Sequence, residues 1–544
     1  MMSCSKIFSG DLPELTYGIM KYFQNDFSTL HSCVLVNRLW CRLAIPLLWE
    51  NPFSIPTKNY KFIEIYLHHL NDDLKTKLSM YNIDDNLFHS NTFFNYPSFI
   101  KYLNILKVIT SILNWLEDVF RTSKPYNRYS LLQGSIFSFK KLICTSLFKI
   151  FIENEVKLYT LDIDISTISN YDPYYYDYFV LILQNPNFIH NIKNLKLYVG
   201  SSSSFLYNNY SSKYVSIKCH ILQVINLHQN LKKILLDNKS FLSYQSLLLS
   251  KGYNCSNTLN TIIFYYIDFK SINNLNKIFE HLNVLESIHI VYCSSLNNKF
   301  IQQIINLTKP FKLKTLFINE ISQIESLKLL FQKSGSYLEN FGYRFMYNYN
   351  LSLKQQLLEL PIKYCKNIKF LDCNGFENQI IYLIFNSIEN IKHNLNYLSI
   401  TTNASYQSYN NIEHISSIIL QNLGQALPPI LEYLSLTLCI KSSDFEVFLK
   451  NSQDTFIKKL LIMNIIQQDS ILPLIKEYIM KKKRVRYLAL IDSSFYVNLG
   501  YDNRDLKDLF LFKDEVKEFS LYNIKVKSYY NELIDMYCFI KEID

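Results

Sequence analysis

The chain has 544 residues, of which 49% are apolar, and its formal net charge is +10. This length suits two or three ordinary domains, or one long repeat array with an appendage. No uninterrupted apolar run approaches the roughly 18 residues of a membrane span, and no aromatic-interleaved basic stripe accompanies the charge, so membrane and nucleic-acid partners are disfavoured.

A short amphipathic helix is predicted near the N-terminus. Pro13 suits a first helical turn, where its missing amide costs nothing, and Asp11 can cap the helix. Leu12, Leu15 and Ile19 then recur at helical spacing. We therefore expect one apolar stripe along this helix.

Two further helices are predicted before residue 50. Ser28 is a candidate cap for a second helix that carries Leu30, and a third begins near Arg38 and carries Trp40 and Leu48. Three helices from about forty residues bury too little surface to be stable alone. Some of their apolar surface should therefore be covered by a partner or by the following domain.

The order of Leu12-Pro13, Val36-x-Arg38-x-Trp40 and Pro46-x-Leu48-Trp49 resembles an F-box over residues 8–50. The resemblance implies binding to a Skp-type adaptor of a cullin-RING ubiquitin ligase. It gives adaptor-binding or module-core roles to Leu12, Pro13, Leu15, Ile19, Leu30, Val36, Arg38, Trp40, Leu43, Pro46, Leu48 and Trp49. The alternative is a helical cap over the hydrophobic end of a larger fold.

Residues 51–154 are less regular. Apolar helical stretches at 105–120 and 142–152 surround a polar loop at 82–98. We interpret this region as a helical bridge with room for one or two degenerate repeats.

An aliphatic-x-x-aliphatic-x-aliphatic pattern returns thirteen times after the bridge. Its copies begin at Leu158, Ile192, Leu231, Leu259, Leu285, Leu313, Leu338, Ile368, Leu395, Leu431, Ile457, Val485 and Val516. Between copies the apolar spacing changes to three and four, as in Ile324, Leu327, Leu330 and Phe331. Each unit is therefore predicted to be a short strand followed by a helix.

Such a unit cannot bury its own apolar faces, but stacked units share one core. The repeats resemble the leucine-rich repeats of F-box proteins, with an irregular signature. The predicted fold is therefore α/β: a three-helix F-box, then a leucine-rich-repeat solenoid at 155–525 with a curved parallel sheet and outer helices. A C-terminal helical cap is expected at 526–544. The ladder position of the repeat is Cys or Asn only at Cys293, Asn403 and Cys439, so most turns must satisfy their backbone otherwise.

Three further segments are candidates for recognition. Residues 171–179 and 200–213 are tyrosine-rich insertions that suit either binding hot spots or ordinary packing and loops. The basic cluster at 481–486 suits either a solvated helix end or a patch for an acidic partner or for nuclear localisation.

Catalytic, cofactor and metal motifs are not found in the sequence. The ten glycines form no phosphate-binding loop and no nucleophile elbow, and the eleven cysteines form no zinc-spaced set. With no signal peptide recognised, we expect a cytoplasmic or nuclear protein.

These features together predict a non-catalytic subunit of an SCF-type ubiquitin ligase. The F-box would bind the adaptor, and the concave face of the repeats would bind a protein target. The alternative is a repeat scaffold that uses the F-box for assembly without ubiquitin transfer. An extracellular repeat receptor would instead require a signal peptide and cysteine-capped repeats.

Overall fold

The structure is a computed structural model that forms two compact units. Unit 1 comprises Met1–Leu235 and Ser243–Leu259, and unit 2 comprises Leu236–Leu242 and Asn260–Asp544. The residues that the structure describes are 12–24, 26–55, 59–79, 92–122, 133–164, 175–190, 192–199, 220, 222–225, 230–238, 241–249, 255–321, 323–344, 350–375, 378–402, 409–465, 470–492 and 508–543.

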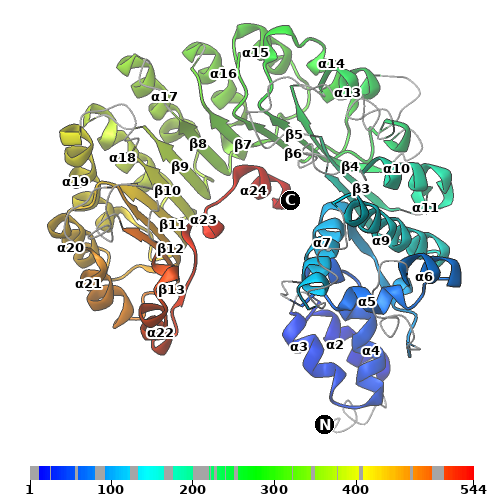
Figure 1. The fold of residues 1–544 in the computed structure, drawn as a ribbon. Helices are drawn as coiled ribbons and strands as arrows, with labels where there is room; N and C mark the ends of the chain where they lie inside the picture. The colour runs from blue at the N-terminus through cyan, green and yellow to red at the C-terminus, as the bar shows by residue number, and fades with distance from the viewer. Residues whose placement is uncertain are drawn as a thin grey trace. The chain divides into compact units, whose positions relative to one another are not determined.

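Unit 1 begins with helices and continues into a parallel sheet (Figure 1). Its helices are α2 (Pro13–Lys21), α3 (Phe27–Val34), α4 (Arg38–Leu48), α5 (Phe62–Leu67), α6 (Asp72–Ser79), α7 (Ile105–Thr122), α9 (Gln133–Glu153), α10 (Tyr175–Gln184) and α11 (Pro186–His190), with α13 (Phe241–Leu248) near its boundary. Its strands are β1 (Tyr102–Asn104), β2 (Thr160–Asp164), β3 (Asn194–Val199) and most of β4 (Leu231–Asp237). β1 pairs with β2, and β2 with β3, in parallel register.

The starts of the first three helices can be compared with the sequence. α2 begins at Pro13 and α4 at Arg38, as predicted. The predicted Ser28 cap is wrong: α3 begins at Phe27, and the Asp26 side chain accepts from the Thr29 amide. Asp11, the predicted cap of the first helix, lies outside the described residues.

Unit 2 alternates strands and helices along the chain. Its strands are β5 (Thr261–Tyr265), β6 (Ser287–Val291), β7 (Leu313–Ile318), β8 (Asn340–Arg344), β9 (Phe370–Asn374), β10 (Tyr397–Thr401), β11 (Ile430–Leu438), β12 (Phe456–Asn464), β13 (Val485–Asp492) and β14 (Lys525–Val526). Its helices are α14 (Leu275–His281), α15 (Asn298–Ile305), α16 (Ile324–Ser334), α17 (Leu351–Tyr364), α18 (Ile381–Ile391), α19 (Tyr409–Ala426), α20 (Ser442–Asn451), α21 (Leu472–Ile475), α22 (Lys513–Leu521), α23 (Tyr529–Glu532) and α24 (Met536–Glu542).

Twelve of the thirteen predicted strands are confirmed, as β2 to β13. Within unit 2 the strands pair in chain order, and every named pair is parallel. This order is that of stacked strand-helix repeats.

The predicted strand at Val516 is wrong, because residues 513–521 form α22. Val516 and Phe519 are three residues apart, a spacing that fits a helix as well as the repeat pattern. The two-residue strand β14 follows α22 and pairs with β13 instead. β1 was not predicted as a strand; its three residues give too little alternation to recognise.

Alternation along each strand separates a helix-covered face from an inner face. In β6, Ile288 and Ile290 belong to the apolar layer between strands and helices, while Ser287 and His289 lie on the other face. Figure 1 shows helices α14 to α21 outside the strands of unit 2 and α24 on the opposite side. We call that opposite side, across β5 to β13, the inner face.

The turns satisfy their backbone partly through residues outside the expected ladder. Asn464 Oδ1 accepts from the Ile440 amide at 3.0 Å, and its Nδ2 donates to Asp492 at 3.2 Å. Asp492 in turn accepts from the Ile471 amide at 3.2 Å. Asn403, one of the three expected ladder residues, lies outside the described residues.

Candidate functional site

The N-terminal helical module, residues 12–50, has a small core of its own. Met20 from α2, Leu30 and Cys33 from α3, and Ala44 and Leu47 from α4 are buried together. Burial raises the pKa of the Cys33 thiol, as expected for a cysteine that serves as a small core hydrophobe. The three helices are therefore held by apolar contacts among themselves.

One stripe of α2 points away from this core. Leu15, Ile19 and Tyr22 follow one another at intervals of four and three residues, and their exposed fractions are 50%, 42% and 91%. Phe23, beside Tyr22, is 36% exposed. Adjacent exposed apolar side chains of this kind are typical of a surface that a partner covers.

A second exposed apolar pair lies in the turn between α3 and α4. Leu35 and Val36 are 75% and 54% exposed. Asn37 caps α4 by accepting from the Trp40 amide at 2.9 Å, which fixes the turn directly after this pair. The pair is therefore presented by a well-defined turn.

The structure separates the predicted contact residues by their accessibility. Leu15, Ile19, Val36 and Arg38 are exposed; Leu12, Pro13, Trp40, Leu43, Pro46 and Leu48 are half-buried; Leu30 and Trp49 are buried. Sequence reasoning missed Tyr22, Phe23 and Leu35. Tyr22 could have been found, because it continues the helical spacing of Leu15 and Ile19.

Trp49 joins the module to the segment that follows it within unit 1. Its ring lies 4.4 Å from that of Tyr96 and 5.4 Å from that of Tyr66, centroid to centroid. The next residue, Glu50, accepts backbone hydrogen bonds from the Lys101 and Tyr102 amides at 2.9 and 3.1 Å. The end of α4 is thus fixed to the start of β1, and Trp49 is a packing residue.

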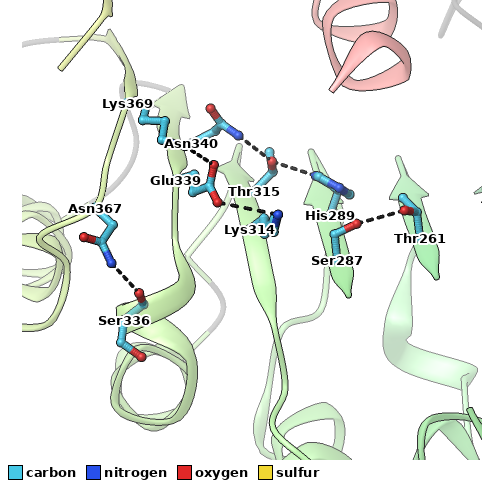
Figure 2. A network of polar contacts seen from close by, with 10 residues as sticks. All are labelled: Thr261, Ser287, His289, Lys314, Thr315, Ser336, Glu339, Asn340, Asn367 and Lys369. Carbon is cyan, nitrogen blue, oxygen red and sulfur yellow. Dashed lines mark hydrogen bonds and ion pairs between the residues drawn. The ribbon is translucent and has the colours of Figure 1, made fainter. Parts of the chain in front are cut away.

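The inner face of unit 2 carries a row of buried polar side chains across β5 to β8 (Figure 2). Thr261 and Ser287 hydroxyls lie 2.9 Å apart. His289 Nδ1 lies 2.7 Å from Thr315 Oγ1, which also accepts from Asn340 Nδ2 at 3.0 Å. Strand register brings these residues together, since Thr261 pairs with Ser287, and Thr315 with both His289 and Asn340.

Ion pairs at the strand starts have a different character. Glu339 lies 3.6 Å from Lys314 and 2.8 Å from Lys369, and all three side chains are partly exposed (Figure 2). Surface pairs of this kind contribute little to stability because water screens them. These pairs lie at an edge of the sheet that is exposed to solvent.

The C-terminal segment, residues 527–543, lies on the inner face. After β14 it forms α23 and α24. The Tyr537 ring makes an edge contact with Tyr265 of β5 at 5.2 Å, and Phe539 makes one with Phe370 of β9 at 4.9 Å. Tyr529 packs with the buried residues Tyr433, Leu461, Ala489 and Ile491.

Polar contacts hold the first half of the same segment. The Tyr529 amide donates to Asp508 at 2.7 Å, and the Ile534 amide donates to the Tyr433 hydroxyl at 3.4 Å. Glu532 pairs with Lys459 of β12 at 2.7 Å. The concave face that was predicted to bind a target is therefore occupied by residues of the segment 527–543.

A buried carboxyl lies on the same face. Asp372 of β9 is 8% exposed, and burial raises its pKa, while the Arg344 guanidinium and the Ser399 hydroxyl act in the opposite direction. The Arg344 guanidinium also lies 4.5 Å above the ring of Tyr292. The inner face therefore combines aromatic rings with buried polar groups.

The basic cluster at 481–486 is divided by the fold. Arg484 is buried, and its guanidinium donates to the Leu449 carbonyl at 3.1 Å and to the Ser452 hydroxyl at 3.1 Å. Lys481 to Lys483 are exposed in the turn before β13. Of the tyrosine-rich insertions, 200–213 and 171–174 lie outside the described residues, and Tyr175 begins α10.

The buried cysteines of unit 2 have the chemistry of core residues, whereas Cys538 is exposed. Burial raises the pKa of Cys293, Cys365 and Cys439 to about 12. Thiols that stay protonated are poor nucleophiles and poor metal ligands. Among the described residues, no group of three or more His, Cys, Asp or Glu side chains is placed to hold a metal ion.

No protein-family model matches the sequence, and a search of curated proteins finds no significant match. Within the described ranges, no helix is both long and apolar enough to cross a membrane.

Proposed function

We propose that this chain is the non-catalytic, target-binding subunit of an SCF-type ubiquitin ligase. Its N-terminal module would bind a Skp-type adaptor, and unit 2 would bind the protein to be modified. The observation that carries the proposal is a folded three-helix module, with the F-box-like order of residues, that exposes Leu15, Ile19 and Val36. Ubiquitin transfer would then take place on the attached enzyme, with this chain supplying proximity.

The exposed residues suit this role on physical grounds. Complete burial of a fully exposed apolar side chain favours association by about 1.5–3 kcal/mol, and a half-exposed side chain gains about half of that. Leu15 and Ile19 share one face of a helix whose other face is fixed by Met20 in the core. A rigid apolar stripe of this kind binds without a large ordering cost.

The experiment is a pulldown of the full chain with a Skp-type adaptor and a cullin. The test variant combines Leu15→Ser, Ile19→Ser and Val36→Ser, all at exposed positions, so it should unfold at the wild-type midpoint. We expect the wild type to retain both partners and the variant to bind the adaptor at least about tenfold more weakly.

The control carries Ile430→Ser and Leu521→Ser, which change apolar residues of unit 2 that are more exposed than the three test positions, at 67% and 80%. It should bind the adaptor like the wild type. Failure of the wild type to bind the adaptor, or equal binding by the test variant, would contradict the proposal. Adaptor binding without cullin would favour an assembly scaffold instead.

A further inference from the structure

The inner face of unit 2 is contacted by a segment that adds a single hydrogen bond to its strand pairing, from the Lys527 amide to the Leu488 carbonyl at 2.8 Å. The parallel sheet ends at β14, where Lys525 and Val526 pair with Tyr487 and Leu488. Beyond Lys527, the contacts of the C-terminal segment with β5 to β13 are apolar and ring contacts, one ion pair and isolated hydrogen bonds. Residues 528–543 can therefore leave the face without breaking the ladder between strands.

Only one side of the C-terminal segment is buried. Tyr529, Tyr537 and Ile540 are buried to 1% or less exposure, whereas Tyr530 is 57% and Leu533 39% exposed. The buried residues are anchors separated by exposed ones, as in a bound peptide that extends across a groove.

The same inner face carries buried polar groups on β6 to β9. His289, Thr315 and Asn340 form one network, and Asp372 lies two strands away from Thr315. Burying such groups is costly, and apolar side chains would cover the same area more favourably. Polar groups that alternate with aromatic rings are instead typical of a surface that selects its ligand.

The charge of the inner face also complements that of the C-terminal segment. Lys459, which lies on the inner face at β12, pairs with Glu532 of the segment at 2.7 Å. The Tyr433 hydroxyl, on the neighbouring strand β11, accepts from the main chain of Ile534. The face thus recognises a carboxylate, a main-chain amide and aromatic rings in a fixed order.

From these contacts we propose that the inner face of unit 2 is a peptide-binding groove, and that the C-terminal segment is its internal competitor. The external ligand is a segment of a partner protein with the same chemistry. It has an aromatic anchor, a carboxylate three residues later, and aromatic residues five and seven positions after the carboxylate, as in Tyr529, Glu532, Tyr537 and Phe539. The inference rests on the proposed function only in taking the partner to be the recruited protein.

The tether explains why a free ligand must compete. Because the segment follows β14 directly, its effective concentration at the groove is in the millimolar range. A free peptide of equal intrinsic affinity at micromolar concentration would be excluded until the segment is weakened. Binding should therefore increase when the segment loses its anchors.

The experiment uses the full chain and a fluorescent synthetic peptide of residues 527–543 as the probe. The release variant carries Tyr537→Ser and Phe539→Ser, and the control variant carries Tyr530→Ser and Leu533→Ser at exposed positions of the same segment. We expect the release variant to bind the probe at least about tenfold more tightly than the wild type or the control variant. Equal binding by all three folded proteins would overturn the proposal.

A charge exchange tests the recognition itself. In the release variant, Lys459→Glu should weaken binding of the native probe at least about threefold, and a probe with Glu532→Lys should restore it. A residue with a purely structural role would not show this restoration. Loss of binding to both probes in a protein that remains folded would contradict the assignment of Lys459.

Amide hydrogen exchange on the wild-type chain gives a measurement that needs no variant. The amides of Tyr529 and Ile534 should exchange at least about tenfold faster than those in the middle of β11 and β12, because the segment opens without unfolding the sheet. Equal exchange rates would show that the segment is an integral part of the fold and would overturn the proposal. None of these assays contains the adaptor, so their failure is distinguishable from failure of adaptor binding.

Discussion

Thr315 Oγ1 lies 2.7 Å from His289 Nδ1 and accepts a hydrogen bond from Asn340 Nδ2 at 3.0 Å, all within the inner face of unit 2. Thr315→Val keeps the shape of the side chain and deprives two buried polar groups of this partner. We expect unit 2 to lose about 2–4 kcal/mol of unfolding free energy in urea denaturation. Thr401→Val, on β10 and outside this network, should change it by less than about 0.5 kcal/mol; a similar loss in both variants would contradict the role of the network.

Two glycines should respond oppositely to alanine. A Cβ on Gly342 would lie 2.5 Å from the Phe317 ring and 2.9 Å from Asp372 Cβ, and Phe317 is fully buried. Gly342→Ala should therefore destabilise unit 2 by about 1–3 kcal/mol. A Cβ on Gly18 meets nothing within 4 Å inside α2, so Gly18→Ala should stabilise the helix by about 0.5–1 kcal/mol. Thermal unfolding of both variants checks the two signs.

Asp372 should make stability depend on pH in a defined direction. Because burial raises its folded-state pKa, the unfolded chain loses this proton first, and the folded state is penalised increasingly from the unfolded pKa, about 3.9, upward. Asp372→Asn should therefore be more stable than the wild type at pH 7, with the advantage vanishing as the pH approaches 3. Urea midpoints measured across this range provide the test, and an advantage that grows on acidification would refute the assignment.

Asp26 should show the opposite behaviour. Hydrogen bonds from the Thr29 hydroxyl and amide lower its pKa, so its contribution is present above the unfolded pKa and disappears as the pH falls through the folded pKa. In Asp26→Ala, unit 1 should therefore unfold at a lower temperature than the wild type near neutral pH, with the difference decreasing in acid. Differential scanning calorimetry at several pH values can measure this difference.

Arg484 is expected to be structural although it belongs to a basic cluster. Its guanidinium donates to the Leu449 carbonyl and the Ser452 hydroxyl, near the end of α20. Arg484→Met should cost about 2–4 kcal/mol in urea denaturation, and Arg484→Lys should not restore this loss, because lysine lacks the planar fork. The exposed neighbour Lys481→Met is the control and should be within about 0.5 kcal/mol of the wild type.

Substitutions of Trp49 and Leu15 should distinguish a residue that packs the N-terminal module from one that contacts the adaptor. Trp49 is buried against Tyr66 and Tyr96, so Trp49→Ala should destabilise unit 1 by about 3–5 kcal/mol. Leu15→Ala, at a half-exposed position, should change the unfolding free energy by less than about 0.5 kcal/mol and yet weaken adaptor binding. A large loss of stability from Leu15→Ala would place this side chain in the core.

Local spacing was enough to locate most strands, because a buried repeat strand has alternating apolar residues over five or more positions. Leu398 and Ile400 of β10 are examples, and both are buried. The same reasoning failed at Val516, where the spacing fits both a strand and a helix, and at β1, where three residues carry too little pattern. The helix starts at Pro13 and Arg38 were predictable for the same local reason, since caps and first-turn residues act within a few positions.

The sequence by itself determined the repeating strand-helix order, the three N-terminal helices and the residue types available for contact. Only the tertiary structure decided which of those residues are accessible: it buries Leu30 and Trp49, exposes Leu15 and Val36, and places residues 527–543 on the inner face of unit 2. The physical reason is the separation along the chain between the residues that interact. Periodicity and capping act between neighbours in the chain, whereas the contact between Tyr537 and Tyr265 joins residues more than 270 positions apart and leaves no periodic trace in the sequence.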